Sequence, residues 1–351
     1  MTGRTERVDL AAEGMQNADL IGLIAVFLLA LVFTGIVRRY AERRLLDVPN
    51  ARSSHRTPTP RGGGAGIAAA FLLGCAYATV AGVDSGCALP IVGGALLIAA
   101  VGFWDDHGHV SPHWRLLVHV TAAVLAVMSL PGGEPLRLGP LAISPGGWAD
   151  FLAVLGIVWF LNLFNFMDGI DGLAGIEVVC VAGGAAVLLS WTAVAPGAFW
   201  APASLAMAGL GFLVWNWPPA RIFMGDVGSG FVGYLLGCQA IATARTGTLS
   251  LAVWLILAGV FCVDATFTLV RRVLTGRRWY QAHRSHAYQH AAQALGSHAA
   301  VDFVVIAING LWLWPLAGLA AWRQEWELPA LLLAYGPLIA LAVHWRAGHS
   351  G

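Results

Sequence analysis

The chain has 351 residues, of which 58% are hydrophobic and only 11% are charged, and its mean hydropathy is +0.71. Soluble domains carry roughly 25% charged residues, so this composition excludes a soluble globular protein and predicts a polytopic membrane protein. Its 20 basic residues are all arginine and its formal net charge is +1, so the overall charge gives no reason to expect a nucleic-acid partner.

A polar stretch over 1–18 precedes the first apolar run. Arg38 and Arg39 follow that run instead of preceding it, and no clear cleavage site ends it, so we expect an uncleaved first span and not a signal peptide. We therefore expect a polar N-terminal tail over 1–18, one transmembrane domain over 19–345 and a short tail over 346–351.

About eleven apolar runs have the length of roughly 20 residues that a spanning helix needs. They cover 19–37, 65–83, 88–104, 115–131, 148–165, 174–193, 198–215, 228–244, 249–270, 300–321 and 328–345. We therefore predict an all-α integral membrane protein, a polytopic bundle of about ten or eleven transmembrane helices.

The distribution of arginine predicts the orientation of this bundle. If the spans alternate, fifteen of the 20 arginines fall on one side, mainly in the loops 38–64 and 271–299 and with Arg115, Arg221 and Arg346. Because cytoplasmic loops carry an excess of basic residues, we expect the N-terminus outside the cell and the C-terminus in the cytoplasm. The dense polar motifs then all lie on the cytoplasmic face, where we expect the active site.

The five cysteines are scattered along the chain and form no CxxC pair: Cys75, Cys87, Cys180, Cys238 and Cys262. We interpret them as buried apolar thiols and expect neither a zinc site nor a disulfide.

The stretch 162–175 reads NLFNFMDGIDGLAG and places two carboxylates beside apolar runs. Uncompensated carboxylates next to hydrocarbon cost several kcal/mol, so these acids should face water, a cation or a polar ligand. If the stretch is helical, Asp168 and Asp171 are i, i+3 neighbours and Asn165 lies one turn earlier on the same face. This face suits a metal ion or a phosphate-bearing substrate, although a polar helix end at the membrane surface would give the same pattern.

Two further acidic motifs follow the same logic. Asp105 and Asp106 close a spanning run in GFWDDHG, and paired carboxylates suit a general base or an acid beside a metal ion. Asp226 stands between Gly225 and Gly228 at a predicted helix start, which suits Mg²⁺ carrying a pyrophosphate, with free backbone N–H groups aimed at the anion. The structural alternative for Asp105 and Asp106 is a helix terminus that reaches water, and for Asp226 it is an ordinary Asp N-cap. A Walker A loop is excluded because it needs lysine.

The segment 47–66 reads DVPNARSSHRTPTPRGGGAG, and its glycines suggest a backbone that lies close to a ligand. Its basic side chains could hold phosphate: Arg52, His55, Arg56 and Arg61. Arginines of the positive-inside kind before a helix breaker would look similar.

The segment HRSHAYQH places His283, His286 and His290 at i, i+3 and i+7, on one face of a predicted helix, with Arg284 among them. Histidines alone could bind zinc, but the surrounding arginines favour contact with phosphate or developing negative charge. A solvated amphipathic helix is the alternative.

Asp264 lies inside a predicted span and is a functional candidate, although a hydrogen bond to Thr266, Thr268 or a neighbouring helix explains it equally well. A secondary transporter could use Asp264 and the paired acids as a proton or cation relay. Transporters place such groups near the bilayer midplane, often with inverted repeats, whereas these motifs cluster at one face and no repeat is evident. A CDP-alcohol phosphotransferase also uses paired aspartates. The signature of that class follows DG with an Ala-Arg pair and further spaced aspartates, and DGIDGLAG does not continue in that way.

The order and spacing of four motifs resemble one known family. They read PNARSSHRTPTPRGGG, FWDD, NFMDGIDGLAG and FMGDVGSG, and the likeness extends from Asp47 to about His290. The chain resembles the polyprenyl-phosphate N-acetylhexosamine-1-phosphate transferases (glycosyltransferase family 4), which include bacterial initiators of O-antigen and teichoic-acid synthesis and, more distantly, phospho-MurNAc-pentapeptide translocase. The family's ten or eleven spans and cytoplasmic active site match the distribution of arginine.

The resemblance implies roles for the acids. Asp226 would be the principal Mg²⁺ ligand and Asn165 a second one. Asp105 and Asp106 match the family's paired aspartates, with Asp105 the choice for deprotonating the lipid phosphate. Asp168 matches an essential acid near the metal.

The resemblance also implies substrate contacts. Asp171 and Asn216 match positions that contact the uridine nucleotide, and His283 and His286 match the motif that meets the diphosphate or the sugar. Arg56 stands where relatives often carry lysine, and its fixed charge could hold phosphate but could not easily donate a proton.

The activity that the resemblance implies is transfer of an N-acetylhexosamine 1-phosphate from a UDP-sugar to undecaprenyl phosphate, with release of UMP. The enzyme would depend on Mg²⁺, with Mn²⁺ as an alternative ion, and would start a lipid-linked surface glycan such as O-antigen in the bacterial inner membrane. Its partners would be undecaprenyl phosphate, a UDP-N-acetylhexosamine and membrane lipid, and a homodimer is left open. The sugar stays open because HRSHAYQH departs from the His-rich string of the peptidoglycan enzymes.

Overall fold

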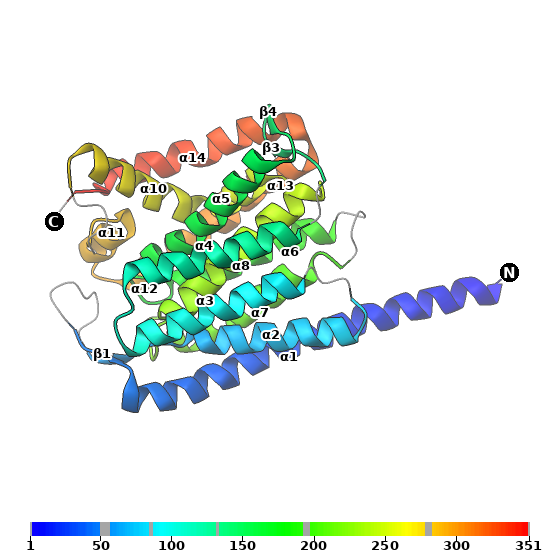
Figure 1. Ribbon diagram of the computed structural model, residues 1–351, viewed down its shortest axis with the longest axis horizontal. Helices are drawn as coiled ribbons and strands as arrows, with labels where there is room; N and C mark the ends of the chain where they lie inside the picture. Colours follow the sequence, from blue (N-terminus) through cyan, green and yellow to red (C-terminus); the bar gives the residue numbers. More distant parts are fainter. Residues whose placement is uncertain are drawn as a thin grey trace.

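The computed structural model describes residues 2–49, 57–83, 87–130, 133–191, 197–277 and 283–349. Over these ranges the chain is a bundle of α-helices with two small antiparallel hairpins (Figure 1). The prediction of an all-α membrane protein is confirmed, because several of its helices are long and apolar enough to cross a membrane.

The helices run in chain order as α1 (Thr2–Arg44), α2 (Gly64–Val80), α3 (Leu89–His107), α4 (Pro112–Ser129), α5 (Gly147–Met167), α6 (Leu173–Ser190), α7 (Trp200–Asn216), α8 (Asp226–Arg245), α9 (Leu251–Leu257), α10 (Gly259–Leu274), α11 (Ala287–Leu295), α12 (His298–Ile308), α13 (Trp314–Trp322) and α14 (Glu327–His344). A π-helical turn (Asn309–Leu313) joins α12 to α13, and a 3₁₀ turn (Gln324–Trp326) precedes α14. Strand β1 (Leu46–Asp47) pairs with β2 (Thr59–Pro60), and β3 (Leu136–Leu138) pairs with β4 (Leu141–Ile143).

Each of the eleven expected apolar runs coincides with a helix or with a bent helix pair. Within the described ranges, seven helices are long and apolar enough to cross a membrane, or up to eight if α9 and α10, which meet at 84°, form one broken span. Helices α2, α4 and α7 are not among these candidates, and α2 and α7 have only 17 residues each. The polar stretch 1–18, expected to be a separate tail, continues as helix into the first span because α1 begins at Thr2.

Helix α8 lies at the centre of the bundle, buried along nearly its whole length and packed against α3 and α5. Glycines allow these close approaches, as they commonly do between helices in lipid. A Cβ atom added at Gly102 of α3 would lie 2.5 Å from the Asp226 carbonyl oxygen, and one at Gly233 of α8 would lie 2.7 Å from the Leu161 Cα atom of α5. The end of α3 and the start of α8 are therefore held in direct contact.

The two ends of the bundle carry different segments. Strand β1, α11 and the C-terminus lie at one end in Figure 1, and the N-terminus and the β3–β4 hairpin lie toward the other. We call the first of these the site end, because the acidic motifs all reach it.

The expectation of no disulfide is wrong. Cys75 of α2 and Cys87, just before α3, form a disulfide with Cα atoms 5.8 Å apart. Because α2 and α3 are joined by a short connection, two thiols 12 residues apart in the sequence come face to face, which no CxxC spacing signals. The bond lies toward the end of the bundle away from β1 and β2. The thiols of Cys180, Cys238 and Cys262 are free and at least partly buried, as expected.

Candidate active site

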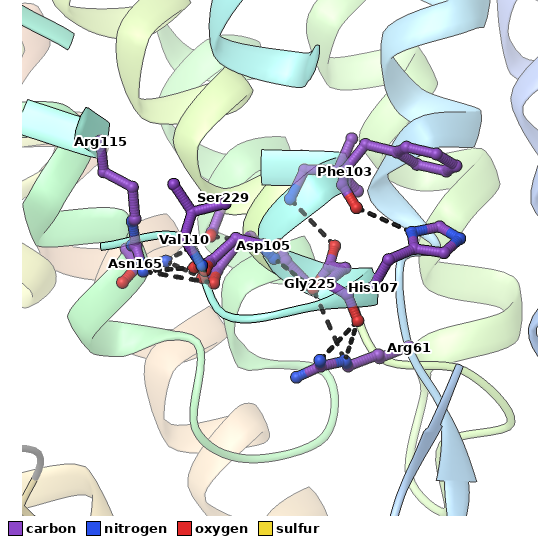
Figure 2. A network of polar contacts seen from close by, with 12 residues as sticks. Arg61, Phe103, Asp105, His107, Val110, Arg115, Asn165, Gly225 and Ser229 are labelled. Carbon is purple, nitrogen blue, oxygen red and sulfur yellow. Dashed lines mark hydrogen bonds and ion pairs between the residues drawn. The ribbon is translucent and has the colours of Figure 1, made fainter. Parts of the chain in front are cut away.

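The predicted acids meet where three helices reach the site end. Asp105 and Asp106 lie in the last turn of α3, Asn165 lies in the last turn of α5, and Asp226 is the first residue of α8. Motifs far apart in the sequence thus form one cluster, shown in Figure 2. Asp226 was predicted at a helix start, and this is confirmed.

Asn165 and Asp226 form the centre of the cluster. The Asn165 side-chain amide donates a hydrogen bond to Asp226 Oδ1 and another, of 3.1 Å, to Ser229 Oγ. The Asp226 side chain keeps 30% of its surface exposed, so an ion could reach it. A carboxylate and an amide oxygen are donors that Mg²⁺ accepts, usually together with substrate phosphates and water and not within an all-protein cage. The described residues include no group of three or more His, Cys, Asp or Glu side chains arranged to hold a metal ion.

Arg115 joins two of the acids, although we had expected it only as one of the arginines on the cytoplasmic side. Its guanidinium forms an ion pair with Asp105 and lies 3.6 Å from Asp226 Oδ2 (Figure 2). The Val110 N–H group donates a 2.8 Å hydrogen bond to the other Asp105 oxygen. Arg115 therefore supplies positive charge where two carboxylates converge, which is the electrostatic task of a divalent cation. The sequence feature that could have indicated this contact is the position of Arg115 in the first turn of the helix that follows the paired acids.

Asp106 connects α3 to the start of α8. Its two carboxylate oxygens accept hydrogen bonds from the backbone N–H groups of Asp226 (3.1 Å) and Val227 (3.2 Å). Arg61 donates to the Asp106 carbonyl oxygen at 3.1 and 2.5 Å. The carboxylate is buried and acts as a cap for α8, so a positioning role accounts for its contacts, and its catalytic role stays a prediction. The expectation that these N–H groups are free to face an anion is wrong.

The Gly-rich segment after Arg61 packs against the chain that leads into α8. The backbone N–H groups of Gly63 and Gly64 donate to the carbonyl oxygens of Phe223 and Met224, both at 2.9 Å. Its close backbone approach therefore serves another segment of the protein in this structure. The other predicted phosphate-holding residues of this motif lie outside the described residues: Arg52, His55 and Arg56.

The expectation that Asn165, Asp168 and Asp171 share one helical face is wrong, because α5 ends at Met167 and both acids lie in the connection to α6. Asp168 nevertheless faces the cluster, where its carboxylate accepts a hydrogen bond from the Gly225 backbone. Burial, and then the negative charge of Asp226, raise the pKa of Asp168 to about 7.

This pKa predicts a pH dependence of stability in protein stripped of divalent ions. Since the folded-state pKa of Asp168 lies above its ordinary value, the folded chain keeps a proton that the unfolded chain has lost, and this stabilisation disappears as the pH rises through about 7. We expect the thermal midpoint measured in a chelator to fall between about pH 5 and pH 8, and to fall less in Asp168→Asn, which cannot ionise. Equal slopes for the two proteins would contradict the assignment.

Asp171 lies on the other side of the same connection, at a pocket of about 640 Å³. Its carboxylate accepts a 3.0 Å hydrogen bond from the Ala220 N–H group and lies 3.4 Å from His298 Nδ1. Arg284 also lines this pocket, together with the apolar rings of Pro218 and Pro219. His298 was not predicted from the sequence, because it stands alone at the start of α12 with no motif around it.

Asn216 is only 3% exposed, and its side chain bonds to the backbone next to this pocket. Its Oδ1 accepts a 3.0 Å hydrogen bond from the Gly172 N–H group, and its Nδ2 donates at 2.9 Å to the Ile222 carbonyl oxygen. Both halves of the amide thus hold backbone segments together. The predicted contact of Asn216 with a nucleotide stays a prediction.

The expectation that His283, His286 and His290 share one helical face is wrong, because α11 begins only at Ala287. His286 is the N-cap of that helix, and His283 precedes it outside any helix or strand, with the two ring centroids 5.1 Å apart. Burial, and then the charges of His286 and Arg272, lower the pKa of His283 to about 4. At neutral pH His283 is therefore an uncharged ring that can accept a hydrogen bond.

Asp264 explains where α11 begins. Its carboxylate accepts 3.0 Å hydrogen bonds from the N–H groups of Ala287 and Tyr288, and it lies 3.2 Å from His286 Nδ1. It also accepts a 3.1 Å bond from the Thr268 hydroxyl, one of the two threonines expected as a structural partner. Asp264 is thus a buried cap that holds the histidine motif to α10, and the structural alternative is confirmed.

Comparison with known proteins agrees with this geometry. The family model described as "Glycosyl transferase family 4" matches residues 88–244. The probable undecaprenyl-phosphate N-acetylglucosaminyl 1-phosphate transferase of Bacillus subtilis is 30% identical over 312 residues, which cover 83% of this chain and 82% of that protein. The decaprenyl-phosphate N-acetylglucosaminephosphotransferase of Mycobacterium leprae is 30% identical, covering 85% of this chain and 82% of that protein. The undecaprenyl-phosphate alpha-N-acetylglucosaminyl 1-phosphate transferase of Escherichia coli K12 is 29% identical, covering 89% and 87%.

Proposed function

The chain belongs to glycosyl transferase family 4. We propose that it transfers N-acetylglucosamine 1-phosphate, or the 1-phosphate of a closely related N-acetylhexosamine with its sugar, from a UDP-sugar to undecaprenyl phosphate and releases UMP. The observation that carries the proposal is the convergence of Asp105, Asn165 and Asp226 beside a pocket that contains Asp171. The names of the relatives specify the sugar phosphate that is transferred and the prenyl phosphate that accepts it. For two anionic substrates, the site offers arginines that could bind phosphate and acids that could bind a divalent cation.

The chemical problem is the attack of one phosphate on another. Mg²⁺ held by Asp226 and Asn165, with Mn²⁺ as an alternative, would offset the charge of the pyrophosphate and stabilise the departing UMP. We assign Asp105 to accept the proton of the lipid phosphate, because Arg115 and the Val110 N–H group fix its carboxylate in place. The freed phosphate oxygen attacks the phosphorus that carries the sugar, and the bond from that phosphorus to UMP breaks.

The remaining groups bind and orient the substrates. Asp171 and the pocket beside it would hold the nucleotide, while Arg61, Arg284 and the histidine motif would offset phosphate charge and contact the sugar. Since burial keeps His283 uncharged at neutral pH, arginine supplies the fixed positive charge. The exposed apolar helix faces would hold the prenyl tail so that its phosphate meets the acids.

The same proposal covers the placement of the chain. The site end would face the cytoplasm, with the N-terminus outside, in a multi-pass protein of ten or eleven spans in the bacterial inner membrane. The arginines of the site end support this orientation, as does the opposite placement of the two chain ends in Figure 1. One transmembrane domain would hold the whole site.

The transporter alternative fits less well. The acids cluster at the end of the bundle, where α3 and α5 stop and α8 begins, whereas a transporter needs such groups near the midplane. Asp264, which was considered as a relay together with the paired acids, binds the N–H groups at the start of α11 as a helix cap.

The direct test is release of UMP by the purified protein with Mg²⁺. We expect UMP only when both UDP-N-acetylglucosamine and undecaprenyl phosphate are present, and a panel of UDP-N-acetyl sugars, including 6-deoxy sugars, would identify the preferred donor. UMP release without prenyl phosphate, or no release with any donor of the panel, would refute the proposed reaction.

Replacing Arg115 by glutamine is expected to lower turnover about 10²-fold, because a cation between Asp105 and Asp226 is lost. Without Mg²⁺ the two carboxylates of this variant repel each other, so the thermal midpoint should fall and Mg²⁺ should restore more of it than in the original protein. Arg61→Gln is the matched control, since the contacts of Arg61 among these acids are with Asp106. An equal Mg²⁺ effect in both variants would remove Arg115 from this role.

A further inference from the structure

The end of the chain packs against the histidine motif. We call residues 345–349 the C-terminal turn and residues 283–290 the histidine segment. The turn follows α14 and closes through a 2.9 Å hydrogen bond from the Ala347 N–H group to the Ala342 carbonyl oxygen. The next N–H group, that of Gly348, donates a 2.7 Å bond to the Ser285 carbonyl oxygen. In Figure 1 the C-terminus accordingly lies near α11 at the site end.

Two arginines, one in the last turn of α10 and one just after that helix, also contact the C-terminal turn. Arg271 donates to the Ala347 carbonyl oxygen at 3.3 Å, and Arg277 reaches the Gly348 carbonyl oxygen at 3.5 Å. The Ala347 side chain is fully buried in this contact. Three successive groups of the turn are therefore fixed, two by arginines that precede the histidine segment and one by Ser285 within it.

Gly348 fits this place because it lacks a side chain. Its φ of +80° lies in the region that favours glycine, and an added Cβ would come within 2.9 to 3.1 Å of three carbons of the Arg271 side chain. A larger residue would meet both penalties together, and the simplest relief is movement of the turn away from Arg271.

Ser285 transmits the contact to the histidines. Its side chain is buried, with its hydroxyl 2.9 Å from His283 Nδ1 and 3.3 Å from the Arg272 guanidinium. In the sequence Ser285 lies between His283 and His286, whose rings stack with their centroids 5.1 Å apart. A hydrogen bond that fixes the Ser285 carbonyl thus fixes the backbone on which both rings are mounted.

We propose that the C-terminal turn is a clamp that holds the histidine segment in its working position, and that Gly348 is the positioning residue that allows the clamp to close. This role rests on the proposed function, in which the histidine segment meets the donor substrate. Within the described residues, the hydrogen bond from the Gly348 N–H group to the Ser285 carbonyl oxygen is the contact through which we expect the turn to act on the histidine segment.

The test compares Gly348→Val with Gly336→Val in the full-length protein. Gly336 lies in the preceding helix α14, and an added Cβ there meets no atom within 4 Å, so it is a control for the same substitution without the clash. Two measurements are made on each variant: hydrogen exchange of the amides of residues 283–295, and steady-state release of UMP as a function of UDP-N-acetylglucosamine and of undecaprenyl phosphate.

In Gly348→Val we expect faster exchange over residues 283–295 and a three- to tenfold lower kcat/KM for the UDP-sugar, the effect of about one lost hydrogen bond. The thermal midpoint and the KM for undecaprenyl phosphate should match those of Gly336→Val. Unchanged exchange would overturn the clamp, and faster exchange with unchanged kinetics would overturn the positioning role. Because exchange is measured without substrate, it separates failure of the clamp from failure of the proposed reaction.

A second pair of variants guards against a folding defect caused by the added side chain. A chain that ends after Arg346 loses the same contacts, and a chain that ends after His349 keeps them and serves as its control. If the shorter chain and Gly348→Val both lower the global thermal midpoint along with activity, the turn is a general stability element and the proposal is wrong.

Discussion

Replacing Asp226 by alanine is expected to lower transfer about 10³-fold or more while leaving the protein folded and inserted in the membrane. Asp226 accepts a hydrogen bond from Asn165 and lies close to the Arg115 guanidinium. Its carboxylate is partly exposed, and we assign it as the ligand of the metal ion. Without it, the ion loses its charged ligand and the pyrophosphate keeps its full negative charge. The measurements are release of UMP and the rise in thermal midpoint on addition of Mg²⁺, both of which should vanish.

A matched control is Glu325→Ala, which removes an exposed acid that pairs with Arg323 near the start of α14, away from the site end. It should keep both the activity and the Mg²⁺ effect. Substantial Mg²⁺-dependent transfer by Asp226→Ala would remove Asp226 from the metal role, and a lost thermal transition would show that the variant tests folding instead of catalysis.

Replacing Asp105 by asparagine is expected to lower kcat about 10²- to 10⁴-fold, the usual contribution of a general base, while UDP-sugar binding persists. The change keeps the shape of the side chain and an oxygen for the Val110 N–H group but removes the proton acceptor. Binding should survive because the pocket beside Asp171 does not include Asp105. Turnover and equilibrium binding of the UDP-sugar, measured on the same preparation, separate the two effects.

The neighbouring Asp106→Asn variant provides the contrast, because the Asp106 carboxylate caps α8. Weakening this cap should cost about 1 kcal/mol of stability, so its thermal midpoint should fall, whereas that of Asp105→Asn should not fall for this reason. If Asp105→Asn lost UDP-sugar binding and kept its kcat, Asp105 would hold substrate and not take a proton. Trapping a phosphorylated Asp105 or Asp106 during turnover would replace direct attack by a covalent mechanism.

The sequence predicted the helical bundle and most of the residues that gather at the site. Apolar runs of spanning length mark the helices, and carboxylates that hydrocarbon would reject mark the ends where helices reach water or a ligand. The start of α8 at Asp226 followed from the flanking glycines, and Gly225 does take a positive φ of 76° there.

Helix boundaries inside the motifs were harder to predict, because tertiary contacts set them. Helix α5 stops at Met167, and Gly172, with φ of 81°, opens α6, so the two DG pairs form a turn instead of a helical face. The start of α11 is set by Asp264, more than 20 residues earlier in the chain. Arg115 was missed for a related reason: an arginine at a cytoplasmic helix end is common, and only the meeting of α3, α4 and α8 shows that it joins two acids.

The capping of α8 by Asp106 has a consequence for how the protein manages charge. The N–H groups of Asp226 and Val227 bind that carboxylate, and those of Gly228 and Ser229 bind the Gly225 carbonyl oxygen. The permanent partial charge at the amino end of this helix is therefore neutralised by the chain itself and is withheld from any incoming phosphate. In the proposed reaction, the repulsion between donor and acceptor would then be offset by side chains and by an exchangeable ion, so the transfer of sugar to lipid would depend on the supply of free magnesium.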